Sequence, residues 1–342
     1  MYRIALTADF YDQQGNPHYH DFGLSVLRGA NSVEIAAFES HLPVIGSEQL
    51  DGVHGALVLS PKITAKSLAR AHDLLVISRF GVGYDSVDIE ACSEKDVLVT
   101  ISKGAVNRSV AEATIAWMLS LNHNVFQKDQ LVRRGLWEER SSLMGSELRQ
   151  KTLGVIGLGG IGLELVGLLK AFGMNQPMAF DPYAPDRSFE SVGARNVGLE
   201  QLLSESDFVS LHCPLTQQTN NLIGQVELGL MKPTAYLLNL ARGGVVDEDA
   251  LFKALRNRSI AGAAVDCFEK EPVNTPHRFG QLDNVILAPH SIAWTNELFS
   301  DIGRVACTSI LDVLTGKIPH GVVNPEITEK QSFQDKWRRV IG

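Results

Sequence analysis

Two series of short, apolar, β-branched segments alternate with longer amphipathic segments along this 342-residue chain. The first series covers residues 3–8, 33–38, 55–60, 74–78 and 97–101. The second covers residues 152–157, 178–181, 208–212, 236–240, 261–266 and 285–288. Such alternation is typical of β-α-β units in parallel sheets. The sequence therefore predicts an α/β protein with two doubly wound, Rossmann- or flavodoxin-like domains and a cleft between them.

The order of the segments also predicts how the domains are connected. An apolar stretch at 110–121 separates the two series and is expected to be a connecting helix. The helical stretch at 297–314 and the polar tail after it are too short for a domain, so they are expected to return to the first one. This gives a discontinuous substrate domain, 1–108 with 292–342, and a dinucleotide-binding domain, 109–291. Trp337, Val340 and Ile341 in the tail could dock on the first domain, or the tail could be frayed.

Composition excludes several classes of partner. The net charge of −8 argues against nucleic acid and against an anionic membrane surface, since both favour basic proteins. No run approaches the roughly 18 apolar residues of a membrane span, and the N-terminus turns polar too early for a signal peptide. The four cysteines lack zinc-type spacing. We expect a cytoplasmic protein with no metal site.

A glycine-rich motif, GLGGIG, follows the strand expected at 152–157 and opens a helical stretch. Gly157 permits a tight turn, Gly159 lets backbone N–H groups approach a pyrophosphate, and Gly162 allows the helix to pack closely on the strand. Asp181 ends the next expected strand, 181 − 162 = 19 residues after the last glycine. That spacing suits a carboxylate that binds the ribose hydroxyls of NAD, although an Asp at a strand end can also be only a turn residue.

Three ionisable residues, Arg242, Glu271 and His290, follow expected strands of the second series. Ligands bind at the carboxyl ends of strands in open α/β sheets, so this is where catalytic groups are expected. Taken alone, each has an ordinary explanation: a solvated arginine, a loop glutamate and a histidine satisfied by neighbours. Because all three residues follow strands that come after a dinucleotide-binding motif, together they predict a catalytic site.

These motifs resemble those of the D-isomer-specific 2-hydroxyacid dehydrogenases, the family of phosphoglycerate dehydrogenase and glyoxylate/hydroxypyruvate reductase. The resemblance covers residues 79–85, 110–112, the glycine fingerprint, 212–216, 239–243, 289–290 and 323–325. It implies hydride transfer between NAD and C2 of a D-2-hydroxy acid or 2-keto acid. Arg242 would bind the substrate carboxylate, His290 would exchange the proton, and Glu271 would hold the imidazole.

The resemblance implies further site residues. Asp266 would bind the nicotinamide carboxamide, and the loop after the fourth strand would supply N–H groups to the substrate carboxylate. It also implies a homodimer formed through the cofactor domain, with residues 135–149 near the contact. The remaining cofactor positions are Gly160, Ile161, His212, Cys213, Pro214, Thr216 and Ala241, and the substrate loop is Arg79, Phe80, Gly81, Val82 and Gly83.

Three positions depart from the family pattern. Lys103 stands where a Pro is frequent and Trp294 where small residues are usual, and both could shape substrate choice. Gly160 replaces a frequent Arg or Asn and is expected to leave phosphate binding intact. If Trp294 fills part of the substrate pocket and Arg79 binds an anionic group at the far end of the substrate, the substrate is a compact polar 2-keto acid. Both side chains could instead point away from the pocket. The sequence does not choose among glyoxylate, hydroxypyruvate, phosphohydroxypyruvate and longer acids. An aromatic near His290 also leaves open a catalytically weak, NAD(H)-sensing binding protein of the corepressor branch.

Overall fold

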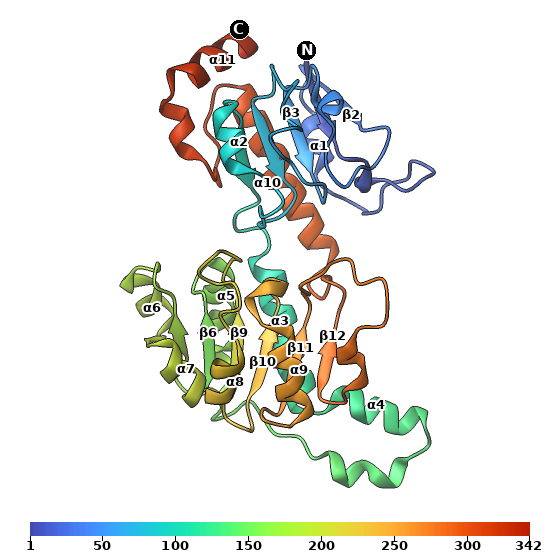
Figure 1. The fold of residues 1–342 in the computed structure, drawn as a ribbon, viewed down its shortest axis with the longest axis vertical. Coiled ribbons are helices and arrows are strands. Elements are labelled where there is room, and N and C mark those ends of the chain that lie inside the picture. The colour runs from blue at the N-terminus through green and yellow to red at the C-terminus, as the bar shows by residue number, and fades with distance from the viewer. The chain divides into compact units, whose positions relative to one another are not determined.

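The chain divides into two compact units in the computed structural model, which describes residues 1–342 (Figure 1). Unit 1 comprises residues 1–106 and 294–342, and unit 2 comprises residues 107–293. The sequence placed these boundaries at 108/109 and 291/292. Each unit is built around one parallel sheet, so the predicted two-domain α/β fold class is confirmed.

Unit 1 contains a five-stranded parallel sheet in the order β2-β1-β3-β4-β5. In each of β3, β4 and β5, at most one of the four residues is not buried, because helices or loops cover both faces of the sheet. At Gly55 an added Cβ would lie 2.9 Å from the Ile310 side chain, so glycine lets a helix approach the sheet closely. The strands are β1 Tyr2–Leu6, β2 Val33–Ala37, β3 Gly55–Val58, β4 Val76–Arg79 and β5 Leu98–Ile101.

The last part of the chain completes unit 1. After the long helix α10 the tail forms α11, whose Phe333 and Trp337 are buried. The Trp337 indole donates a hydrogen bond to the Val313 carbonyl at 2.7 Å, so the tail docks and is not frayed. The helices of this unit are α1 Leu24–Arg28, α2 Ile89–Glu94, α10 Asn296–Leu314 and α11 Gln331–Ile341, with single turns η1 Ala8–Phe10, η2 Ser47–Leu50 and η7 Pro325–Glu329. None of the helices combines the length and the apolar composition that a membrane span requires.

Unit 2 contains a seven-stranded parallel sheet in the order β12-β11-β10-β9-β6-β7-β8. The six strands expected from the second series are all present. The edge strand β8 was not expected, because its two residues are exposed and carry no hydrophobic pattern. The strands are β6 Leu153–Ile156, β7 Met178–Phe180, β8 Arg195–Asn196, β9 Phe208–Leu211, β10 Tyr236–Asn239, β11 Gly262–Val265 and β12 Val285–Leu287.

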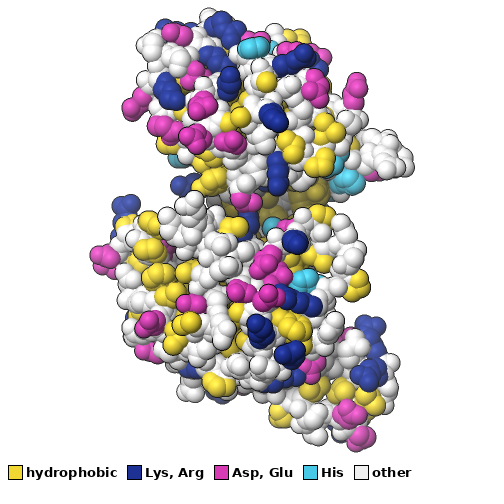
Figure 2. All heavy atoms as spheres, viewed as in Figure 1, with side chains coloured by type: hydrophobic (Ala, Val, Ile, Leu, Met, Phe, Trp, Pro, Cys, Tyr) yellow, Lys and Arg dark blue, Asp and Glu magenta, His cyan; other side chains and the backbone are white.

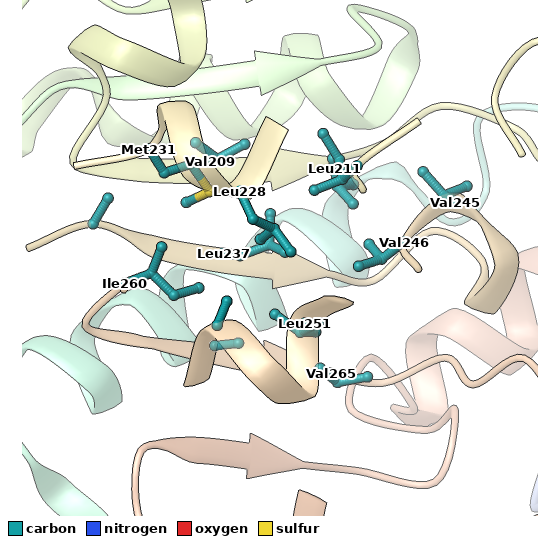
Figure 3. Packing of buried hydrophobic residues seen from close by; sticks show 14 of the residues in the cluster. Val209, Leu211, Leu228, Met231, Leu237, Val245, Val246, Leu251, Ile260 and Val265 are labelled. Carbon is teal, nitrogen blue, oxygen red and sulfur yellow. The ribbon is translucent and has the colours of Figure 1, made fainter. Parts of the chain in front are cut away.

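Helices cover both faces of this sheet. Figure 3 shows the buried cluster on one face, where Val209, Leu237 and Val265 of the strands meet Leu228 and Leu251 of the helices. A second cluster joins α3 and α5 to the other face. The helices are α3 Asn107–Asn122, α4 Val125–Arg133, α5 Gly160–Leu169, α6 Asp186–Val192, α7 Leu199–Glu205, α8 Gln225–Leu230 and α9 Glu248–Arg256, with turns η3 Trp137–Leu143, η4 Lys170–Phe172, η5 Gly243–Val245 and η6 Arg278–Gln281.

One segment of unit 2 projects away from its sheet: α4 and the turn η3 form an arm in Figure 1. Neither element has a buried residue. Large hydrophobic side chains are exposed along it, including Val132, Trp137 and Met144. Figure 2 shows hydrophobic side chains on this arm, together with acidic and basic ones.

Candidate active site

The glycine fingerprint of unit 2 forms the turn between β6 and α5. Gly157 has φ 93°, and a Cβ there would lie 2.7 Å from the Cys213 backbone nitrogen, so only glycine fits. A Cβ on Gly162 would lie 2.5 Å from the Gly157 carbonyl oxygen, which explains the close packing of helix on strand. At Gly159 an added Cβ would meet no atom within 4 Å. The turn therefore leaves open space in front of the Gly159 backbone.

Helix α5 starts in this turn, with Gly159 as its N-cap and Gly160 and Ile161 in its first turn. The first N–H groups of a helix have no intrahelical acceptor and carry the positive end of the helix dipole. Together with the open space at Gly159, they form a cradle suited to the pyrophosphate of a dinucleotide.

Asp181 is held rigidly beside the same turn, directly after β7. Its Oδ2 accepts a hydrogen bond from the Leu158 N–H at 2.8 Å, and its Oδ1 accepts from the N–H groups of Tyr183 and Ala184 at 2.9 and 3.1 Å. A carboxylate has about four acceptor sites and these bonds use three of them, so one further hydrogen bond from a ribose hydroxyl can be accommodated. The ribose-binding role of Asp181 stays a prediction that this geometry permits.

The loop after β9 contains His212, Cys213, Pro214 and Thr216. His212 Nε2 lies 2.8 Å from the Ser210 hydroxyl, and burial lowers the pKa of its imidazole to about 4. Burial also raises the pKa of the Cys213 thiol to about 11. His212 is therefore neutral and Cys213 is a thiol at physiological pH, so neither is suited to acid–base or nucleophilic chemistry. Both remain predicted as cofactor contacts through backbone groups.

Arg242 lies just beyond β10 in a turn held by one buried side chain. The Asn239 amide donates to the Arg242 carbonyl at 2.9 Å and accepts from the Ala241 N–H at 3.1 Å. The guanidinium itself donates to the Ala241 carbonyl at 2.7 Å. Asn239 is only 2% exposed, so the turn that carries Arg242 is fixed from inside the sheet.

Glu271 and His290 come together at the ends of β11 and β12. His290 Nδ1 lies 2.8 Å from Glu271 Oε2, while Glu271 Oε1 accepts a hydrogen bond from the Phe268 N–H at 2.8 Å. The His290 side chain is 45% exposed and that of Glu271 is 34% exposed. Both oxygens of Glu271 are therefore engaged, and the pairing leaves His290 Nε2 for another partner.

The electrostatics of this pair favour an ion pair. Interactions with Cys267 and with the Glu271 carboxylate, which is paired with Nδ1, raise the pKa of His290 to about 10, against the opposing effect of burial. Burial opposes ionisation of Glu271, but the hydrogen bond and charge of His290 outweigh it, and the pKa of Glu271 is lowered. At neutral pH the pair is a carboxylate and an imidazolium, which is a proton donor.

The backbone of His290 adopts an unusual conformation that its neighbours maintain. Its φ is 52°, in the left-handed region, which a histidine adopts at some cost. The His290 N–H donates to the Asp266 carbonyl at 2.8 Å. Asp266 Oδ1 accepts from the N–H groups of Ser291 and Ile292 at 2.9 and 3.3 Å. Asp266 therefore braces the histidine turn, and its predicted contact with the carboxamide is untested.

Contacts between the loops that carry Arg242 and Glu271 were not apparent from the sequence. A Cβ on Gly243 would lie 2.0 Å from the Phe268 carbonyl carbon, so these two loops touch through backbone. Glu248 and Glu269 add a reciprocal pair, each accepting the backbone N–H of the other, at 2.7 and 3.1 Å. A polar Asn239 ending an apolar strand was the one signal in the sequence for any of these supports.

Unit 1 contains the predicted carboxylate loop, in which Phe80 is buried and Gly81 has φ 137°. Val82 and Gly83 follow on its partly exposed side. Arg79 Nε donates to the Gly83 carbonyl at 3.0 Å, and its Nη1 donates to the carbonyls of Val58 and Leu59. Arg79 therefore braces this loop, and its predicted contact with a distal anion is untested.

Trp294 belongs to an aromatic cluster of unit 1. Its ring centroid lies 5.1 Å from that of Phe299 and 5.9 Å from that of Tyr19, both edge to face. Its side chain remains 53% exposed. The predicted contact of Trp294 with substrate stays a prediction.

Known proteins resemble this chain over most of its length. Residues 115–291 match the family described as D-isomer specific 2-hydroxyacid dehydrogenase, NAD binding domain. The chain is 39% identical over 318 residues to D-3-phosphoglycerate dehydrogenase of Methanocaldococcus jannaschii. That alignment covers 91% of this chain but 59% of the relative, so the chain spans less than two thirds of that protein.

Other relatives are matched over more than four fifths of their length. Glyoxylate reductase of Aeropyrum pernix is 38% identical over 279 residues, which cover 80% of this chain and 83% of the relative. A solved structure of D-lactate dehydrogenase from Aquifex aeolicus, complexed with NAD and lactic acid, has a TM-score of 0.80 at 27% identity and covers 94% of this chain and 98% of its own. The chain therefore belongs to the D-isomer-specific 2-hydroxyacid dehydrogenases, a family of NAD-dependent oxidoreductases, and residues 115–291 are its NAD-binding domain.

Proposed function

We propose that this chain transfers a hydride between NAD and C2 of a D-2-hydroxy acid or its 2-keto acid. The observation that carries the proposal is the 2.8 Å hydrogen bond between His290 and Glu271, placed beyond the same sheet that carries the glycine fingerprint. Arg242 follows a strand of that sheet as well. An acid–base pair, a carboxylate-binding cation and a dinucleotide cradle are the groups this reaction needs.

His290 is the proposed proton donor in the direction of keto-acid reduction. Bound NADH supplies the hydride that forms the new C–H bond at C2. As the carbonyl π bond breaks, His290 Nε2 gives its proton to the carbonyl oxygen, which becomes the hydroxyl group, and the imidazole becomes neutral. Glu271, on Nδ1, stabilises the imidazolium before transfer and fixes the ring. In the oxidative direction, neutral His290 Nε2 takes the hydroxyl proton.

Arg242 is proposed to bind the substrate carboxylate. A guanidinium presents N–H donors in a planar fork that matches two carboxylate oxygens, and its charge polarises the adjacent carbonyl. Asn239 supports this role because it fixes the turn that carries the arginine. The N–H groups of the Phe80–Gly83 loop are proposed as a second set of donors to the carboxylate.

The test of this function is the oxidation of NADH, followed by its absorbance, with a panel of 2-keto acids: glyoxylate, hydroxypyruvate, phosphohydroxypyruvate and 2-ketoisocaproate. We expect turnover of at least one acid. NADH binding without turnover of any of them would contradict the proposal and indicate a cofactor-sensing protein.

We predict a strong preference for NADH over NADPH. Asp181 is fixed beside the fingerprint turn and would accept a hydrogen bond from the ribose hydroxyls, whereas its charge would repel a 2′-phosphate. Comparing kcat/KM for the two cofactors checks this, and Asp181→Asn should narrow the gap. Equal efficiency with both cofactors in the unaltered protein would show that another group sets the choice.

We predict that Glu271→Gln displaces the pH profile toward acid. His290 must be protonated for reduction, so the rate is constant at low pH and falls as pH rises through its pKa. Removing the carboxylate charge lowers that pKa, so the reductive rate begins to fall at lower pH. The rise of the oxidative rate with pH is displaced to lower pH as well. Profiles of kcat/KM measured in both directions check the shift. Glu190→Gln, at an exposed acid of α6, is the matched control, and identical profiles for all three proteins would refute the pairing.

We also infer a homodimer and a cytoplasmic location. The arm formed by α4 and η3 supports the dimer, because Trp137 is 61% and Met144 81% exposed there, and such apolar surface is usually covered by a partner. Both residues lie in the region 135–149 expected at the contact. All four cysteines are free thiols, which suits a reducing compartment.

A further inference from the structure

Gly160 leaves a space in the fingerprint turn that another side chain fills. A Cβ built on Gly160 would lie 2.5 Å from Nδ2, 2.8 Å from Oδ1 and 2.9 Å from Cγ of Asn107. The amide of Asn107 therefore occupies the place where a side chain at position 160 would begin. This is the position at which the fingerprint departs from the frequent Arg or Asn.

The packing of two helices brings Asn107 to this point. Asn107 is the first residue of α3, and Gly160 is the first residue of α5. The next residue of α3, Arg108, forms an ion pair with Glu164 of α5 at 3.4 Å. The amino-terminal ends of both helices therefore lie side by side, with the Asn107 amide between them and next to the first N–H groups of α5.

The chemistry of the amide suits an anion at this place. Asn107 is partly exposed, and the structure shows no hydrogen bond from its side chain to the protein. Its Nδ2 carries two N–H donors at any physiological pH. A hydrogen bond to a phosphate oxygen is charge-assisted and stronger than one between neutral groups.

We propose that Asn107 is a pyrophosphate ligand of NAD, donating from Nδ2 to a phosphate oxygen in place of a side chain at position 160. The proposal rests on the cofactor site at the glycine fingerprint and is independent of which substrate is reduced. Asn107 is thus a binding residue contributed by the helix that precedes the sheet, and the fingerprint motif does not include it.

The test is binding of NADH and of ADP-ribose to the full chain, measured by calorimetry without substrate. We expect Asn107→Ala to raise both dissociation constants about 10-fold, the effect of one hydrogen bond to a charged group. Asn107→Asp has nearly the same shape but places a negative charge beside the phosphates, so it should weaken binding more than alanine does. Binding of adenosine, which has no phosphate, should be unchanged in both variants.

A double-mutant cycle separates this role from a structural one. In Gly160→Ala the new Cβ would collide with the Asn107 amide, so binding of ADP-ribose should weaken. In the Asn107→Ala background the same change should have little effect, because the amide is already gone. Asn196→Ala and Asn196→Asp, at an exposed edge strand, are the matched controls and should bind as the unaltered chain does.

Two results would overturn the proposal. One is unaltered ADP-ribose binding by Asn107→Asp. The other is an equal loss of adenosine and ADP-ribose binding, which would indicate damage to the fold. Neither depends on turnover: a chain that binds ADP-ribose through Asn107 but reduces no keto acid would contradict the proposed reaction and leave this inference standing.

Discussion

His290→Ala is expected to lower kcat for keto-acid reduction by about 10²–10⁴-fold, the usual contribution of a general acid–base group. The variant loses the proton donor that Cys267 and Glu271 hold in its charged form, with a pKa of about 10. Water must then protonate the developing alkoxide. The measurement is the steady-state rate at saturating NADH and keto acid.

The binding of NADH separates a chemical defect from a general one. His290 lies beyond β12, and the fingerprint turn follows β6, so the dissociation constant of NADH should change little. His320→Ala, at an exposed histidine of unit 1, is the matched control and should keep full activity. A kcat for His290→Ala within a few-fold of normal would remove the histidine from the mechanism.

Arg242→Ala is expected to damage both substrate binding and turnover. Loss of a charge-assisted, bidentate contact corresponds to about 1.5–3 kcal/mol, or roughly 10- to 150-fold in kcat/KM. Lost polarisation of the carbonyl adds to this effect in kcat. Steady-state kinetics should therefore show a raised KM together with a lowered kcat. Arg242→Lys keeps the charge but loses the planar fork, so it should recover only part of the activity.

Arg195→Ala provides the comparison for this variant, because it removes an arginine from the edge strand β8. Its KM and kcat should match those of the unaltered chain. If Arg242→Ala raised KM with no change in kcat, the arginine would bind substrate and transition state equally and would not polarise the carbonyl.

The strands were predictable because each one carries its own signal. Eleven of the twelve strands have apolar sequences that need no knowledge of their neighbours, and β6 shows this with all four residues buried. The edge strand β8 has two exposed residues and no pattern of its own; its pairing with β7 defines it. The docking of α11 likewise depends on a partner, since the Trp337 indole bonds to a carbonyl of α10.

The site residues divide in the same way. Arg242, Glu271 and His290 could be proposed from the sequence because each follows a strand of the parallel sheet, and strand ends converge in such folds. The contacts that hold these residues in place could not be predicted. Gly243 touches the backbone of Phe268, and the Asn107 amide lies against Gly160, between segments far apart in the chain. Such contacts depend on loop geometry, which a single sequence does not encode as a pattern.

Transfer of isotope from the cofactor tests the central claim most directly. NADH carrying deuterium at the transferred position of C4 would be incubated with a 2-keto acid, and the product analysed by mass spectrometry and chiral chromatography. The account predicts a D-2-hydroxy acid with deuterium at C2, formed by the unaltered chain and nearly absent with His290→Ala. Oxidation of NADH that yields no hydroxy acid labelled at C2, or yields the L isomer, would contradict it.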